Sequence, residues 1–217
     1  MSKATGEWPF LFLYIQAMNF LAHIHLSGDN KEIKIGNFIA DSVRKKDLEN
    51  FSPQIQLGIH LHWAIDEFTD HHPTVKLSKE LLYEDYHKYS AVLVDIYYDH
   101  YLAKNWSNYS NEDLRFFVND FYHLMKEANP ELPQNIQRML PYMVRYDWLF
   151  NYQFISGIDQ VLGGMSRRAS FKNSMHKGAR SLEKHYEEFK KHFEEFYPEL
   201  TEHVATKKTE FEQELGL

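Results

Sequence analysis

Apolar residues recur at spacings of three and four along nearly the whole chain, and this period is the feature that most constrains the fold. In the segment LGIHLHWAIDEFTDHH, Leu57, Leu61, Ile65 and Phe68 fall on one side of a helix. Asn-Gly and Asp-Gly turns, the strongest local mark of a β-hairpin, do not occur in the sequence. The pattern therefore predicts an all-α fold, a compact multi-helix bundle.

The same period and the proline positions predict where the helices lie. Residues 1–17 are expected to be a peripheral N-terminal extension, and residues 18–217 a single all-α domain. Prolines are expected to mark mostly helix starts and stops, at positions 53, 73, 130, 133, 141 and 198. The expected helices are 18–27, 31–43, 53–71, 74–83, 85–105, 110–128, 133–150, 154–164 and one or two between 173 and 215.

Composition excludes several classes of site. The 217 residues include no cysteine, so any metal must be held by His, Asp or Glu. A net charge of −7, from 24 basic and 31 acidic residues, disfavours nucleic acid as a partner. No apolar run is long enough to span a bilayer, and the first residues form only a weak signal peptide, so we expect a cytoplasmic protein with no membrane partner. The sequence does not indicate an oligomeric state.

Acidic residues interrupt two apolar helices at the same spacing. His62, Asp66 and Asp70 fall one above another beside the core face of the helix 53–71. Side chains four apart on a helix lie ~5–6 Å apart at Cβ, which lets a histidine and an aspartate share one cation. Two like charges at this spacing are unfavourable beside a core, so a positive partner is expected there.

The second interruption is in SAVLVDIYYDHYLAKNW, where Asp95 and Asp99 are four apart and His100 follows. Two such pairs suggest a shared cause. An alternative is that these acids cap neighbouring helices or pair with arginine, the candidates being Arg44, Arg138 and Arg145.

Two further segments offer ligands of the same type. His23 lies in MNFLAHIHLSG, and Asp41 follows Gly36 and Asn37 in KIGNFIADSV. A lone histidine in an apolar helix is more often a hydrogen-bonded core residue. Together, however, the four segments supply the donors of a site coordinated by oxygen and nitrogen, which favours Mn²⁺, Fe²⁺ or Mg²⁺ over structural zinc.

The order of these motifs resembles that of the acyl carrier protein phosphodiesterases, also called acyl carrier protein hydrolases. The motifs are MNFLAHIHL, GNFIADSV, GIHLHWAIDEFTDHHP, LVDIYYDHYLAKNW and GMSRR, and they span about residues 18 to 170. The resemblance implies an all-α fold distantly related to the HD-domain phosphohydrolases and a Mn²⁺-dependent release of 4′-phosphopantetheine from holo-acyl carrier protein. The positions that match the family's motif residues are His23, Asp41, His62, Asp66, Asp70, Asp99 and His100.

From this resemblance we predict roles for the matching residues. Asp70 or His100 is expected to protonate the leaving serine oxygen, with His100 ranked first because the pKa of an imidazole lies near neutrality. The chain departs from the family at Trp63, where an arginine is common. The predicted metal ligands are His23, Asp41, His62, Asp66 and Asp99.

An acidic carrier protein can bind a chain of net charge −7 only at a concentrated positive surface. Arg44, Lys45 and Lys46 follow Asp41 directly and are the first candidates; Arg167 and Arg168 are the second. A short basic run is equally often a solvated helix end or loop.

Three alternatives remain open at this stage. One is a related HD-like metal phosphohydrolase that acts on a nucleotide or small phosphate ester, and another is a non-catalytic helical binding protein. The third is a di-metal carboxylate oxidase, which requires two Glu-x-x-His motifs. Glu84-x-x-His87 matches this motif, whereas Asp120-x-x-His123 matches it only in part, with Asp in place of Glu.

Overall fold

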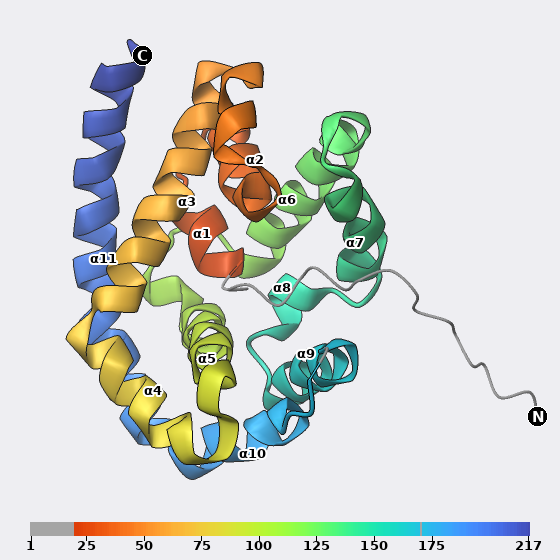
Figure 1. The fold of residues 1–217 in the computed structure, drawn as a ribbon, viewed down its shortest axis with the longest axis vertical. Helices are drawn as coiled ribbons and strands as arrows, with labels where there is room; N and C mark the ends of the chain where they lie inside the picture. The colour runs from red at the N-terminus through yellow and green to blue at the C-terminus, as the bar shows by residue number, and fades with distance from the viewer. Residues whose placement is uncertain (1–19, 170) are drawn as a thin grey trace, which may run out of the picture.

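The computed structural model describes residues 20–169 and 171–217 (Figure 1). Its described part is built from α-helices and short 3₁₀ turns without a strand, so the predicted all-α bundle is confirmed. The predicted extension 1–17 lies outside the described residues. The helices are α1 (Phe20–Leu26), α2 (Lys31–Ile39), α3 (Pro53–His71), α4 (Pro73–Tyr86), α5 (Ser90–Lys104), α6 (Leu114–Ala128), α7 (Gln134–Arg145), α8 (Trp148–Asn151), α9 (Ile155–Arg168), α10 (Gly178–Lys184) and α11 (Tyr186–Leu215).

Helix α3 has the bounds that its sequence predicts. The Ser52 hydroxyl accepts a hydrogen bond from the backbone N–H of Ile55 at 3.3 Å, and Pro53 occupies the first turn, where its missing N–H costs nothing. Pro73 starts α4 in the same way. The expectation is wrong for Pro141 and Pro198, which lie inside α7 and α11.

Two predicted helices are interrupted by residues with positive φ. The range 133–150 divides into α7 and α8 because Asp147 adopts a left-handed conformation with φ 50° and ψ 49°. The range 85–105 loses its first turn because His87 has φ 47°, and α5 begins only at Ser90. A single residue outside the helical region ends the hydrogen-bond ladder, and the apolar period does not reveal it.

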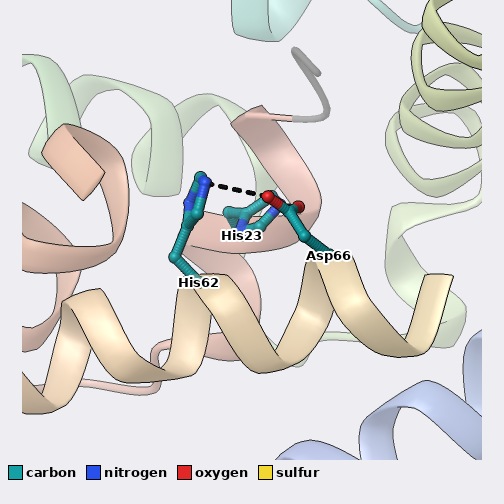
Figure 2. A group of neighbouring side chains, drawn as sticks. All are labelled: His23, His62 and Asp66. Atoms are coloured by element: carbon teal, nitrogen blue, oxygen red, sulfur yellow. Dashed lines mark ion pairs between the residues drawn. The ribbon is translucent and has the colours of Figure 1, made fainter. Parts of the chain in front are cut away.

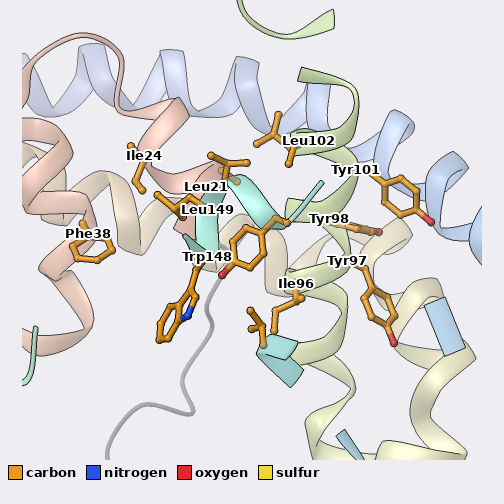
Figure 3. Close-up of a cluster of buried hydrophobic side chains, with 14 of the residues drawn as sticks. Leu21, Ile24, Phe38, Ile96, Tyr97, Tyr98, Tyr101, Leu102, Trp148 and Leu149 are labelled. Atoms are coloured by element: carbon orange, nitrogen blue, oxygen red, sulfur yellow. The ribbon is translucent and has the colours of Figure 1, made fainter. Parts of the chain in front are cut away.

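Helix α5 is the centre of the bundle. Every residue from Val92 to Ala103 is buried, and the helix packs against α1, α4, α9 and α11. Figure 3 shows Ile96 and Leu102 of this helix among side chains of α1 and α8. A helix that is apolar on all sides belongs in a core, and its two aspartates are therefore exceptional there.

Helices α2 and α3 approach closely because glycine occupies the contact on both sides. A Cβ atom at Gly36 would overlap the carbonyl oxygen of Ile55, and one at Gly58 would overlap the carbonyl oxygen of Ile33. This contact sets the short distance between the end of α2, which leads into Asp41, and the face of α3 that includes His62.

The long helix α11 lies along α3, α4 and α5 and covers the bundle on one side (Figure 1). Its buried stripe includes Phe189, Phe193 and Phe196, as the amphipathic pattern predicts. Among the residues described, no helix combines the length and the apolar character that a membrane span needs.

Candidate metal centre

His23, His62 and Asp66 form a compact group between α1 and α3 (Figure 2). His62 and Asp66 lie one turn apart on α3, with His62 Nε2 3.2 Å from Asp66 Oδ2. His23 Nε2, on α1, lies 3.3 Å from Asp66 Oδ1. The three ligand-type atoms are within 4.8 Å of one another, which one cation can bridge. The predicted stripe on α3 is thus joined by a histidine distant in sequence.

Asp41 adds a fourth donor at the edge of this group. It lies in the 3₁₀ turn Ala40–Ser42 after α2, and its Oδ1 is 3.3 Å from His62 Nε2. The two carboxylates are about one-third exposed, with side-chain exposures of 30% for Asp41 and 32% for Asp66, whereas the imidazoles of His23 and His62 are buried. The group therefore opens to solvent on its carboxylate side, where a substrate can approach.

A buried amide lies behind the two histidines. Asn37 Oδ1 is 2.7 Å from His23 Nδ1 and 3.2 Å from His62 Nδ1, and the two imidazole rings lie 4.3 Å apart. Each ring has one nitrogen toward Asn37 and the other toward the aspartates. Sequence reasoning missed this residue, because its complete burial becomes visible only in the structure.

The electrostatics of the group favour a positive occupant. Burial alone lowers the pKa of His62, but hydrogen bonds with Asp41 and Asp66 outweigh it and raise the pKa to about 10. Burial likewise raises the pKa of Asp66, yet the adjacent imidazoles of His23 and His62 hold it well below its usual range. Without a metal, the proton on His62 supplies the positive charge between the two carboxylates.

The donor set fits a divalent cation. His23 Nε2 is buried and has no hydrogen-bond partner among the described residues, although it is directed toward Asp66. Two imidazole nitrogens and two carboxylate oxygens can bind Mn²⁺, Fe²⁺ or Zn²⁺, and the sequence contains no thiolate. Three predicted ligands, His23, His62 and Asp66, therefore lie together in a geometry suited to a metal, and Asp41 borders them through His62.

The fifth predicted ligand, Asp99, lies elsewhere. It is fully buried, and its two carboxylate oxygens accept hydrogen bonds from the backbone N–H groups of Leu21 and Ala22, each at 2.9 Å. The structure thus places Asp99 at the first turn of α1, as the capping alternative expected. Asp99 therefore contributes to the metal group, the cluster of His23, His62 and Asp66, by holding in place the helix that includes His23.

The two predicted proton donors also lie outside the group. His100 is fully buried, with Nδ1 donating to the Tyr152 carbonyl at 2.7 Å and Nε2 2.9 Å from the Tyr186 hydroxyl. Burial lowers the pKa of His100 to about 4, so the ring is neutral near pH 7. Asp70 is exposed and pairs with Lys79 at 2.8 Å, one turn beyond Asp66.

Asp95 is a second residue that the predicted site left out. It is buried on α5, and no hydrogen bond to its carboxylate is found among the described residues. Burial, and after it the charge of Asp66, raise its pKa to about 8, with smaller contributions from Asp70 and Asp41. The spacing of four residues between Asp95 and Asp99 marks the pair in the sequence. That spacing does not show which of the two carboxylates is linked by charge to Asp66.

The basic residues lie in two separate places. Lys45 is in the turn after Asp41, with its ammonium 5.5 Å from the ring centre of Trp63, the residue that follows His62. Arg44 pairs with Asp47 at 2.6 Å. Arg167 and Arg168 end α9, which packs against α5, α8 and α10. The first basic segment is therefore beside the metal group.

The alternative of a di-metal carboxylate oxidase gains no support. Within the described part of the chain, His23, His62 and Asp66 form the one cluster that meets the geometric requirement for a metal. Of the residues that the alternative needs, Glu84 is exposed on α4, and His123 is exposed on α6 and pairs with Glu127.

Fold and site together define an all-α protein with a cluster of two histidines and one aspartate that could hold a metal ion, with a second aspartate at its edge. The sequence pattern of the acyl carrier protein phosphodiesterases matches residues 18–200, and this chain belongs to that family.

Comparison with characterised proteins gives the same family. The chain is 31% identical over 194 residues to a protein of Escherichia coli O6:H1 (strain CFT073) named acyl carrier protein phosphodiesterase, covering 88% of this chain and 99% of the relative. A protein of the same name from Photorhabdus laumondii is also 31% identical over 194 residues, covering 88% and 96%. No solved structure matches the chain.

Proposed function

We propose that this chain hydrolyses the phosphodiester between 4′-phosphopantetheine and the serine of holo-acyl carrier protein, leaving apo-acyl carrier protein. The proposal is supported by the family to which the chain belongs and by the name of its relatives. The observation that carries the chemistry is the meeting of His23, His62 and Asp66 with Asp41 at a solvent-facing edge. The same group would serve a small phosphate ester, so substrate choice must come from the surface around it.

In this proposal four residues hold the divalent cation: His23, Asp41, His62 and Asp66. When bound, such a cation supplies a Lewis acid for a phosphoryl oxygen and a water of lowered pKa. We propose Mn²⁺, with Fe²⁺ or Mg²⁺ as alternatives, because mixed nitrogen and oxygen donors without thiolate suit these ions. Both carboxylates are at the open edge, where they can orient an attacking water by accepting its hydrogen bonds.

The leaving serine oxygen needs a proton. Asp70 is the proposed donor, because it is solvent-exposed and lies one turn beyond Asp66 on the same helix. His100 is enclosed by Tyr152 and Tyr186, and we propose that it stabilises the core instead.

For docking of the acidic carrier protein we propose the basic segment Arg44, Lys45 and Lys46. Lys45 lies against Trp63 on α3, so this segment borders the side of the site that includes Asp41. Reversal of Lys45 and Lys46 to Glu should raise KM for holo-acyl carrier protein severalfold, with a salt-dependent penalty, and spare a small artificial phosphodiester. Equal losses on both substrates would contradict a docking role, and no loss on either would favour Arg167 and Arg168.

The direct test of the proposed function is a turnover assay. Protein stripped with chelator and reconstituted with Mn²⁺ is incubated with holo-acyl carrier protein, and mass spectrometry detects loss of the phosphopantetheine group. Parallel reactions with nucleotides and small phosphodiesters test the alternative phosphohydrolase. Full activity in excess chelator would overturn the metal mechanism, and Mn²⁺ binding without any turnover would favour a binding protein.

A further inference from the structure

Asn37 is a fully buried amide between the two histidines of the metal centre. Its Oδ1 is the shared partner of His23 Nδ1 at 2.7 Å and His62 Nδ1 at 3.2 Å. Its Nδ2 donates to the backbone carbonyl oxygen of His23 at 3.1 Å. Because that carbonyl can only accept, the amide must turn its NH₂ toward it and its oxygen toward the two rings.

This orientation decides the protonation pattern of both imidazoles. An amide oxygen has no hydrogen to donate, so each Nδ1 must carry the hydrogen of its contact with Asn37. In the neutral form of an imidazole this is the ring's one N–H, so in that form the Nε2 lone pair of each ring is available to a cation. His62 Nε2 lies 3.3 Å from Asp41 and 3.2 Å from Asp66, and His23 Nε2 lies 3.3 Å from Asp66.

The close packing of α2 on α3 brings Asn37 to this place. A Cβ at Gly58 would come within 2.8 Å of the Asn37 backbone nitrogen, so the glycine lets α2 lie against α3 one turn before His62. The backbone of α1 is held at the same point, because the Asn37 amide bonds to the His23 carbonyl oxygen. One side chain on α2 thus contacts both helices that supply histidines.

We propose that Asn37 is a positioning residue, whose single carboxamide oxygen fixes both histidines with Nε2 directed at the cation. The inference rests on the metal centre proposed above. It assigns the amide of the GNFIAD segment, which the sequence motif leaves without a role, to the orientation of the ligands.

The first test needs no variant of Asn37 and no activity. Ring nitrogen chemical shifts of ¹⁵N-histidine-labelled protein distinguish protonated from unprotonated nitrogens, and His23→Gln and His62→Gln assign the two signals. Measured without metal and with Zn²⁺ as a diamagnetic probe, both rings should have a protonated Nδ1, and Zn²⁺ should shift Nε2 alone. An unprotonated Nδ1 in either ring overturns the proposal.

The second test measures Mn²⁺ affinity by electron paramagnetic resonance of the free ion. Asn37→Leu, which removes the acceptor, should weaken binding about 10–100-fold. Asn37→Asp keeps an acceptor oxygen and should bind Mn²⁺ far more tightly than the leucine variant. Asn105→Leu is the matched control, because it removes an amide hydrogen-bonded to the Tyr101 carbonyl at the end of α5 and should leave the affinity unchanged.

The outcomes separate this inference from the proposed function. Wild-type affinity in Asn37→Leu, or an equal loss in the leucine and aspartate variants, would overturn the positioning role even if the enzyme hydrolyses the carrier protein. Absence of Mn²⁺ binding in the wild type would overturn the metal centre, and the ring nitrogens would then show by themselves whether Asn37 fixes the two histidines.

Discussion

The acidic pairs of α3 and α5 have the same spacing and opposite surroundings. Asp66 and Asp70 lie on a helix with one solvent-facing side, whereas Asp95 and Asp99 lie on a helix enclosed by the bundle. In each pair the first member is electrostatically linked to the metal centre. The second member of the α3 pair, Asp70, pairs with Lys79 of α4. The second member of the α5 pair, Asp99, accepts hydrogen bonds from the backbone at the start of α1. Equal spacing thus links the first acid of each pair to the metal centre and gives the second a partner outside it.

Among the four acids, substitution of Asp66 should have the largest effect on activity. Asp66→Asn removes the carboxylate that both histidines face, so turnover should fall by at least about 100-fold, and Mn²⁺ binding should weaken with it. Helical circular dichroism should stay nearly unchanged, since the two side chains have similar volume. Asp70→Asn is the partner variant and should retain Mn²⁺ affinity, because Asp70 faces Lys79. Equal loss of Mn²⁺ affinity in both variants would show that Asp70 contributes to the metal site as much as Asp66 does.

Substitution of Asp99 should lower the stability of the protein. Asp99→Asn leaves at most one acceptor for the N–H groups of Leu21 and Ala22, so the free energy of unfolding should fall by about 1–3 kcal/mol. Urea denaturation of metal-free protein measures this loss. An unchanged unfolding midpoint would mean that α1 does not depend on α5 for its position.

At Asp95 the same substitution should have the opposite effect on stability. Burial raises the pKa of Asp95 to about 8, above the ordinary 3.8. Ionisation of this buried carboxyl therefore lowers the free energy of unfolding progressively as pH rises from 3.8 to about 8. Asp95→Asn should therefore raise the melting temperature of metal-free protein, more at pH 8 than at pH 4. Destabilisation like that of Asp99→Asn would show that the two acids share a structural role.

The last prediction concerns the pH dependence of the metal centre. Hydrogen bonds with Asp41 and Asp66 raise the pKa of His62 from 6.5 to about 10 despite its burial. Its contribution to the stability of metal-free protein is therefore complete below pH 6.5 and is lost as pH rises through about 10. Proton and metal compete for Nε2, so Mn²⁺ affinity should increase over the same interval. Calorimetry from pH 6 to 10 with His62→Gln as control tests this, and a flat profile would contradict it.

Much of the fold follows from local sequence signals. The range of α3 follows from Ser52, Pro53 and a regular apolar period, because capping and periodicity act within a few residues. The division at Asp147 does not follow, since a left-handed residue leaves no trace in the apolar pattern. Likewise, spacing within one helix placed His62 and Asp66 on one stripe, whereas His23 was assigned to the same site by the family resemblance and not by its spacing.

The sequence by itself determined the helical class, the absence of thiolate ligands and the His62–Asp66 pair, because all three depend on residue type or on spacing within one helix. Only the tertiary structure decided that Asp99 caps α1, that His100 is enclosed and that Asn37 contacts both histidines. These roles depend on contacts between residues 14 to 86 positions apart, which form when whole helices pack, as α2 does on α3 through Gly36 and Gly58.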